Sequence, residues 1–203
     1  MTSAYQDFQI LIRDTRNTSV LYDYLHDYMN APLDYSDLLR WQWAQSVSAL
    51  DKLLHDLIRI GMREAFSGTR QSTAAFNAFS IDIITLQRIK QNPLSKEIEF
   101  EKYVSAKHAL LSFQMPEKIA GGLALIWTEQ HKWQAIAVQM GRTEVDVKTE
   151  LTNIVTRRNQ IVHQGDYAAS GQPRQNIEKA DTERTVNFIE QLGTAIYTLV
   201  SAP

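Results

Sequence analysis

The segment 156–166, TRRNQIVHQGD, concentrates arginine, asparagine and histidine side chains just before a glycine–aspartate pair. A histidine that titrates near neutral pH can accept and donate protons, which cleavage of a phosphodiester by transesterification requires. An arginine can hold the non-bridging phosphate oxygens through paired hydrogen bonds while keeping its own proton. These residue types are therefore compatible with an RNA-cleaving site. They are equally compatible with a plain helix end, where cations favour the negative end of the helix dipole.

The spacing of the arginines and the histidine is weak evidence by itself. The chain has five histidines, and about one arginine–histidine pair at a comparable spacing is expected by chance. The directions of the side chains on a helix are more informative, at about 100° per residue. Arg157 points away from the apolar stripe of this predicted helix and is interpreted as an ordinary surface residue.

Arg158 falls within an apolar stripe of the predicted helix, and this position needs an explanation. The stripe comprises Val147, Leu151, Ile154, Val155 and Val162. A guanidinium in such a stripe is costly unless it is paired or faces a cleft. Asn159 and His163 are stacked one helical turn apart on the flank of the stripe. Arg158 and His163 are about 140° apart on an ideal helix, so either the arginine stem bends round or a second copy completes the site across a two-fold axis.

The composition excludes several other classes of protein. The 203 residues are 44% hydrophobic and 22% charged, which is typical of a globular domain. No apolar run is long enough to span a membrane, the N-terminus does not resemble a secretory signal, and the absence of cysteine suits the cytoplasm. The formal net charge of −2 lacks the basic excess of most nucleic-acid-binding proteins. Any such function must therefore rest on a local site.

Hydrophobic periodicity predicts an all-α fold, organised as a single domain over residues 1–203. The predicted core helices cover about 36–66, 116–141, 143–164 and 174–201, with an N-terminal helical region at 3–29 and a helical insert at 68–115, in which helices are expected at 74–91 and 94–112. Thr143 is a candidate N-cap of the helix that carries Arg158, and Gly165 is well suited to end it. In the N-terminal region, Tyr24 and Tyr28 are expected to pack in the core rather than to stack on nucleobases.

Two blocks of the sequence resemble a known family. Residues 132–166 are similar to the prokaryotic HEPN superfamily, and specifically to RiboL-PSP-type HEPN domains, whose penultimate core helix ends in Arg-Asn-x-x-x-His. Here the signature is Arg158-Asn159-Gln160-Ile161-Val162-His163, followed by Gly165-Asp166. Residues 48–61, SALDKLLHDLIRIG, are similar to the first core helix of the family, with Asp51 and His55 at its polar positions.

The resemblance implies a HEPN-like helical bundle that forms a homodimer through its motif helices. It further implies a metal-independent endoribonuclease, which needs no cofactor, leaves a 2′,3′-cyclic phosphate, and acts in toxin–antitoxin systems or phage defence, with an antitoxin or defence partner possible. By position, His163 would be the general acid and base, Arg158 the phosphate ligand, and Asn159 the residue that orients them. Asp51, His55 and Asp166 are expected to support this site.

Two alternatives remain open at this point. Some members of the superfamily have no nuclease activity, so the chain could be a non-catalytic module for dimerisation or for nucleotide or RNA binding. Asp51 and His55 could equally form an ion pair on the surface of a helix. One departure is informative: a related toxin group carries a modified tyrosine two residues after the histidine, where this chain has Gly165. That form of control is therefore not expected.

Overall fold

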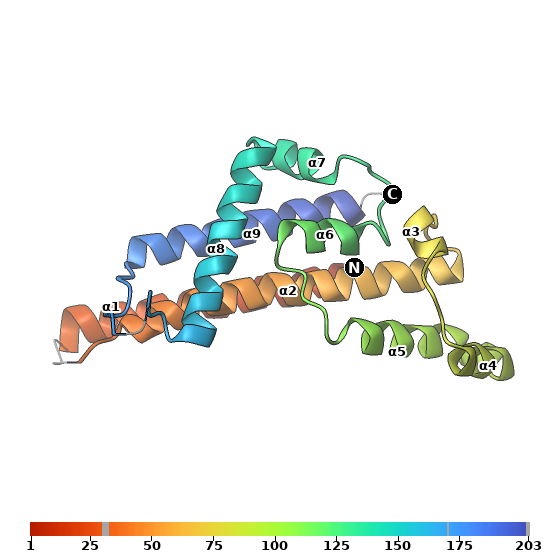
Figure 1. Cartoon of the computed structure of the whole chain (residues 1–203), viewed down its shortest axis with the longest axis horizontal. Helices are drawn as coiled ribbons and strands as arrows, with labels where there is room; N and C mark the ends of the chain where they lie inside the picture. The colour runs from red at the N-terminus through yellow and green to blue at the C-terminus, as the bar shows by residue number, and fades with distance from the viewer. Residues whose placement is uncertain (30–32, 170, 202–203) are drawn as a thin grey trace.

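The computed structural model describes residues 1–29, 33–169 and 171–201, and its fold is an all-α bundle (Figure 1). The helices are α1 (Thr2–Asp23), α2 (Ser36–Ser67), α3 (Ala74–Asn77), α4 (Ile83–Gln91), α5 (Lys96–His108), α6 (Pro116–Leu123), α7 (Lys132–Gln139), α8 (Glu144–Gln164) and α9 (Lys179–Ser201), with a π-helix η1 (Tyr24–Met29) and a 3₁₀-helix η2 (Pro93–Ser95). Of the helices in these ranges, none has the length and hydrophobicity needed to cross a membrane.

The long helix α2 forms the centre of the bundle. It packs against α1, α5, α8 and α9, and Figure 1 shows α1, α2 and α9 lying side by side along the long axis of the molecule. One face of α2 is a buried apolar stripe that consists of Val47, Leu50, Leu54, Leu57, Ile58 and Gly61. Burial of this continuous stripe supplies much of the hydrophobic stabilisation of the fold.

Helix α8, which carries the Arg-Asn-x-x-x-His segment, runs steeply across α2 (Figure 1). The indole Nε1 of Trp43 on α2 donates a hydrogen bond of 3.0 Å to the carbonyl of Ile154 and so fixes the crossing. Both predicted ends of α8 are confirmed. The Thr143 side chain accepts a hydrogen bond from the Asp146 amide, and Gly165 adopts a left-handed conformation with φ of 60°.

The helix expected over 116–141 is instead two helices, α6 and α7, so this boundary was wrong. The chain leaves the helix after Leu123, where side chains from another segment donate hydrogen bonds to its backbone carbonyls. The Thr73 hydroxyl donates to the Ala124 carbonyl at 2.7 Å, and the Arg70 guanidinium donates to the Ile126 carbonyl at 3.2 Å. Since buried carbonyls need hydrogen-bond partners, these contacts make the break possible.

Two further helix predictions need correction. The helix expected over 74–91 is divided into α3 and α4, because the side chains of Thr73 and Asp82 each cap a separate helix start. The last helix begins at Lys179 rather than near 174. The residues from 171 to 178 are not helical, and Arg174 forms an isolated antiparallel bridge with Tyr167, the residue pair that comes closest to β-structure in the described part of the chain.

Helix α4 is the element least integrated into the bundle. It packs mainly against α5 and η2, and in Figure 1 it lies at the far end of the molecule, away from α1 and α8. The only residue of α4 classed as buried within its described length is Thr85, whereas Ile83, Ile84 and Leu86 are exposed. Within the predicted insert, α4 is thus a peripheral appendage, whereas α5 belongs to the core through the buried Phe100 and Val104.

The N-terminal tyrosines do not lie in the core, contrary to expectation. Tyr24 is 53% exposed and Tyr28 is 81% exposed, both on η1. Their rings pack on one another with centroids 6.0 Å apart. The pair therefore lies on the surface, because η1 continues α1 beyond the region where α1 is covered by α9.

Candidate functional site

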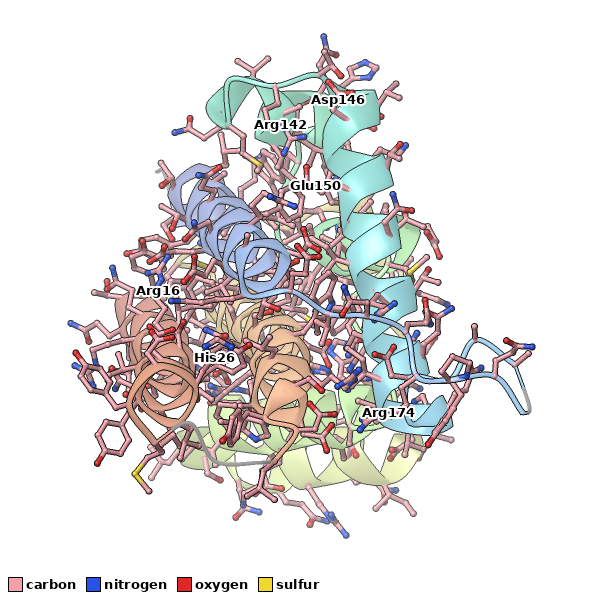
Figure 2. All side chains as sticks on the ribbon, turned by 90° about the vertical axis from the view of Figure 1, so that its left-hand side faces the viewer. Arg16, His26, Arg142, Asp146, Glu150 and Arg174 are labelled. Carbon is pink, nitrogen blue, oxygen red and sulfur yellow. The ribbon has the colours of Figure 1, made fainter. Side chains whose placement is uncertain are left out.

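The Arg158, Asn159 and His163 side chains lie in the last turns of α8. Figure 2 shows α8 at the edge of the molecule, with one side against the bundle and the other open to solvent. As predicted, Leu151, Ile154 and Val155 of its apolar stripe are buried. Arg158 continues that stripe and is half-buried, so its guanidinium lies at the boundary between the core and the solvent.

The guanidinium of Arg158 has unused hydrogen-bonding capacity. Its Nη1 donates to the Asn159 side-chain oxygen at 3.1 Å, and its Nε is buried with no hydrogen-bond partner. Among the described residues, no carboxylate forms an ion pair with it. A buried donor without a partner is destabilising, so an arginine left in this state is well prepared to receive an anion such as a phosphate.

Asn159 and His163 are both exposed, on the flank of the Arg158 stripe. The imidazole of His163 has no hydrogen bond within the described ranges, and it lies in the last turn of α8. Beyond Arg158 the apolar stripe is no longer covered, since Val162 is 49% exposed. The end of α8 therefore presents a polar pair and an uncovered apolar side chain together, which suits contact with another molecule.

Arg157 is not the ordinary surface residue expected from the sequence. Its side chain is 18% exposed, and its Nη2 forms an ion pair of 2.8 Å with Asp166, whose side chain is completely buried. Arg157 also donates to the Gln175 side-chain oxygen and, at 3.0 Å, to the Asn176 carbonyl. The interpretation from the helical wheel was wrong because the segment after α8 folds back and covers the face on which Arg157 lies.

Asp166 anchors the turn that follows His163. Its carboxylate Oδ2 accepts a second ionic hydrogen bond, at 2.7 Å, from Nε of the buried Arg40 on α2. Its backbone is also fixed, because its amide donates to the Gln160 carbonyl and its carbonyl accepts from the Gln175 amide. Asp166 keeps a positive φ of 68°, which is uncommon outside glycine and is tolerated best by Asp and Asn.

The contribution of Arg40 was missed at the level of sequence. Arg40 and Asp166 are 126 residues apart, and nothing in the local pattern of α2 links them. Arg40 also donates to the Gln175 carbonyl at 2.8 Å, so it joins α2 to both sides of the turn. Figure 2 shows Arg174, the residue before Gln175, on the segment that returns beside the C-terminal end of α8.

Asp51 and His55 have a different set of partners. Asp51 accepts hydrogen bonds from the Phe113 amide at 2.6 Å and from the Gln114 side chain at 3.1 Å. His55 lies 3.2 Å from the Leu111 carbonyl and 3.9 Å from Asp51. Among the described residues, none of their hydrogen bonds or ion pairs involves α8. Their contacts hold the segment between α5 and α6, and they give no independent support to a place near Arg158.

The comparison with protein families decides the assignment. The family model described as RiboL-PSP-HEPN matches residues 10–202, which is nearly the whole chain. The chain belongs to the RiboL-PSP-HEPN family. No curated protein and no solved structure matches it.

Membership of the RiboL-PSP-HEPN family supports a nuclease or other RNA-related function at a coarse level, and RNA binding and dimerisation are common among HEPN domains. The match also agrees with the all-α bundle. In the ranges that the structure describes, no group of three or more His, Asp or Glu side chains is arranged to hold a metal ion. The residues available for chemistry at the end of α8 are therefore Arg158, Asn159 and His163, which we call the Arg158 cluster.

Proposed function

We propose that this chain is a metal-independent endoribonuclease that acts as a homodimer, as a toxin or a phage-defence effector in the cytoplasm. The observation that carries the proposal is the state of Arg158. It is half-buried, has no carboxylate partner among the described residues, and keeps an unsatisfied Nε beside Asn159. The adjacent Arg157 is engaged with Asp166 and Gln175, so of these two described arginines it is Arg158 that is free to bind a phosphate.

In this proposal Arg158 binds the non-bridging oxygens of the scissile phosphate. Charge develops on these oxygens as the RNA 2′-oxygen attacks phosphorus and the bond to the 5′-oxygen breaks. A guanidinium already in position stabilises that charge without reorganisation. Asn159, which accepts the hydrogen bond from Arg158, orients the guanidinium. Asp166 supports the site indirectly by fixing the turn after His163.

His163 moves the protons. One imidazole removes the proton from the 2′-hydroxyl, and a second returns a proton to the departing 5′-oxygen. The products are a 2′,3′-cyclic phosphate and a 5′-hydroxyl. Each chain carries a single His163, so a dimer that brings two motif helices together would supply both imidazoles. It would also bring Arg158 of one protomer towards His163 of the other. Within one helix the two side chains point in directions too different for them to share a ligand easily.

The exposed end of α8 favours this dimer. The uncovered Val162 continues a stripe whose earlier members are buried, and the polar Asn159 and His163 lie beside it. Burying this surface against its symmetry mate would remove apolar area from water and exclude solvent from the phosphate site.

The decisive experiment measures cleavage of single-stranded RNA in EDTA, with analysis of the product ends. The wild type should yield 2′,3′-cyclic phosphate ends, and His163→Ala and Arg158→Ala should each lower the rate by about 10²-fold or more. His131→Ala, which alters an exposed histidine at the start of α7, is the matched control and should leave the rate unchanged. Cleavage that survives both substitutions in the Arg158 cluster would eliminate the proposal.

The second candidate function is a non-catalytic module that dimerises or binds nucleotides or RNA. The observation in its favour is that His163 has no hydrogen-bond partner to orient it within the described residues of one chain. This candidate predicts binding of RNA without turnover and full tolerance of His163→Ala. The same assay, combined with an RNA-binding measurement, separates the two.

A further inference from the structure

A cavity opens at the C-terminal end of α8, directly after His163 in the sequence. Its volume is about 560 Å³, and its described lining consists of Gln164, Tyr167, Ala168, Ala169 and Gly171. This volume lies within the range of sites that hold small molecules. None of these residues is charged, and three of them are small, so the cavity suits a flat, neutral group better than a phosphate.

The aromatic ring of Tyr167 is the largest apolar surface in this cavity. Tyr167 is 47% exposed, and one edge of its ring rests on Gly165, where a Cβ atom would meet ring atoms at 3.4 Å. No described side chain stacks on the remaining surface of the ring. Exposed rings of this kind are the platforms on which unpaired nucleobases stack, typically with about 1–3 kcal/mol per base.

The backbone that carries the Tyr167 ring is held by its neighbours. Asp166, the preceding residue, is completely buried under Arg40 and Arg157. On the other strand of the turn, Arg174 forms the bridge with Tyr167, and its Nε donates to the Gly165 carbonyl at 2.9 Å. Because this backbone is already ordered, less conformational freedom is lost when a ligand binds to the ring, which favours affinity.

Gln164 adds a group that can read the edge of a base. Its side-chain amide has one donor and one acceptor face, and neither has a partner among the described residues. Bases in a double helix are stacked and paired, so they cannot offer a face to Tyr167 and a pairing edge to Gln164 together. Unpaired bases can, and this is the usual basis of sequence-dependent RNA recognition.

The charge of the protein gives a second reason to expect base contacts. With a formal net charge of −2, the chain lacks the basic surface from which most RNA-binding affinity arises by counterion release. Phosphate contacts at Arg158 alone would bind RNA weakly. Stacking on Tyr167 would supply affinity that does not depend on net charge.

We infer that the cavity formed by Gln164 and Tyr167 binds one unpaired nucleobase of an RNA strand, adjacent to the nucleotide whose phosphate lies at Arg158. This inference rests on the proposed function and deepens it. The substrate class is single-stranded RNA or an unpaired loop. Tyr167 and Gln164 determine specificity and take no part in moving protons.

The test is a double-mutant cycle between protein and RNA, performed on the His163→Ala protein so that the RNA stays intact. A short fluorescein-labelled single-stranded RNA is titrated and its anisotropy is measured. Tyr167→Ala should weaken binding about 5- to 150-fold, the equivalent of stacking one base, whereas Tyr167→Phe keeps the ring and should bind nearly as the parent does. Tyr28→Ala removes a more exposed tyrosine from η1 and should have no effect.

The RNA side of the cycle uses oligonucleotides with an abasic linker at one position at a time. At one position the linker should weaken binding to the parent, and there Tyr167→Ala should cause no further loss. Additive effects at every position, or equal losses in Tyr28→Ala and Tyr167→Ala, would overturn the inference. Its failure is distinguishable from failure of the proposed function, because cleavage by the wild type is measured separately and does not require this cycle.

Discussion

Arg157 and Asp166 form an ion pair of 2.8 Å across the end of α8, and the carboxylate of Asp166 is completely buried. Arg40 on α2 forms a second ion pair with the same carboxylate. This arrangement joins three parts of the chain, namely the motif helix, the turn after His163 and the central helix of the bundle. The positions of His163 and Tyr167 therefore depend on buried charges that take no direct part in chemistry, and several predictions about stability and activity depend on this arrangement.

Asp166→Asn should strongly destabilise the protein. Asparagine has the same shape and tolerates a positive φ, but its neutral amide leaves Arg40 and Arg157 without their carboxylate. Loss of one partner of a buried ion pair costs about 3–5 kcal/mol, which urea unfolding followed by circular dichroism would measure. Asp37→Asn removes an exposed partner of Arg174 and Arg40 and should cost at most about 1 kcal/mol. Equal losses in the two variants would contradict the structural role assigned to Asp166.

Arg157→Ala and Arg158→Ala should have opposite consequences although the residues are adjacent. Arg157→Ala removes contacts to Asp166, Gln175 and Asn176, so the free energy of unfolding should fall by about 2 kcal/mol or more. Arg158→Ala removes a guanidinium whose Nε is unsatisfied, so stability should change little while RNA cleavage falls by about 10²- to 10³-fold. Parallel unfolding and cleavage measurements on both variants provide the check, and the assignment fails if Arg157→Ala is the more stable of the two.

The two neighbouring glycines of α6 should respond differently to alanine. A Cβ at Gly122 would lie 2.5 Å from Cδ1 of Ile58 and 2.7 Å from Cε1 of Phe113. Gly122→Ala should therefore lower the free energy of unfolding by about 1–3 kcal/mol. At Gly121 no atom lies within 4 Å of the added methyl group, so Gly121→Ala should raise stability by up to about 1 kcal/mol through helix propensity. Thermal unfolding of both variants tests the close approach of α6 to α2, which a tolerated Gly122→Ala would disprove.

Stability should decrease in mildly acidic solution because of His108. Burial lowers the pKa of the His108 imidazole below its ordinary value of 6.5, with smaller contributions from the charges of His55 and Lys107. Below about pH 6.5 the unfolded chain binds a proton at His108 that the folded protein resists. The free energy of unfolding is therefore undiminished above that pH and falls as the pH decreases towards the folded pKa.

His108→Phe should flatten this pH dependence. The imidazole packs edge-on against the rings of Phe79 and Phe113, and its Nδ1 is buried without a partner, so a phenyl ring suits the same space. Urea midpoints measured between about pH 7.5 and 5.5 give the slope. His26→Phe alters an exposed histidine of η1 and should keep the slope of the wild type. An unchanged slope in His108→Phe would show that other groups control the acid sensitivity.

The elements predicted well from sequence are those whose signals are local. The ends of α8 follow from the side chain of Thr143 and from the conformational freedom of Gly165, and both act within one helical turn. The buried stripe of α2 follows from periodicity alone. Periodicity also placed Arg158 within the apolar stripe of α8, where the structure shows it half-buried.

The elements predicted poorly depend on partners that are distant in the sequence. The break between α6 and α7 requires Arg70 and Thr73 to donate hydrogen bonds to the freed carbonyls, and nothing in the sequence of 116–141 indicates that these partners are present. The late start of α9 and the burial of Arg157 share one cause, the return of the Gln175 segment along α8 under Arg40. Helical wheels describe one helix, so they cannot show which face another segment will cover.

The sparse attachment of α4 has a consequence for how the molecule unfolds. Apart from Thr85, its residues in the described range contribute little buried surface, so opening α4 disturbs few contacts of the central bundle. Its amide hydrogens should exchange with solvent through local opening, at a free energy well below that of global unfolding. The amide hydrogens of α2 should exchange only when the whole protein unfolds. A protease should accordingly nick the chain first around η2, and the α1–α2–α9 bundle with α8 would remain folded around the cut.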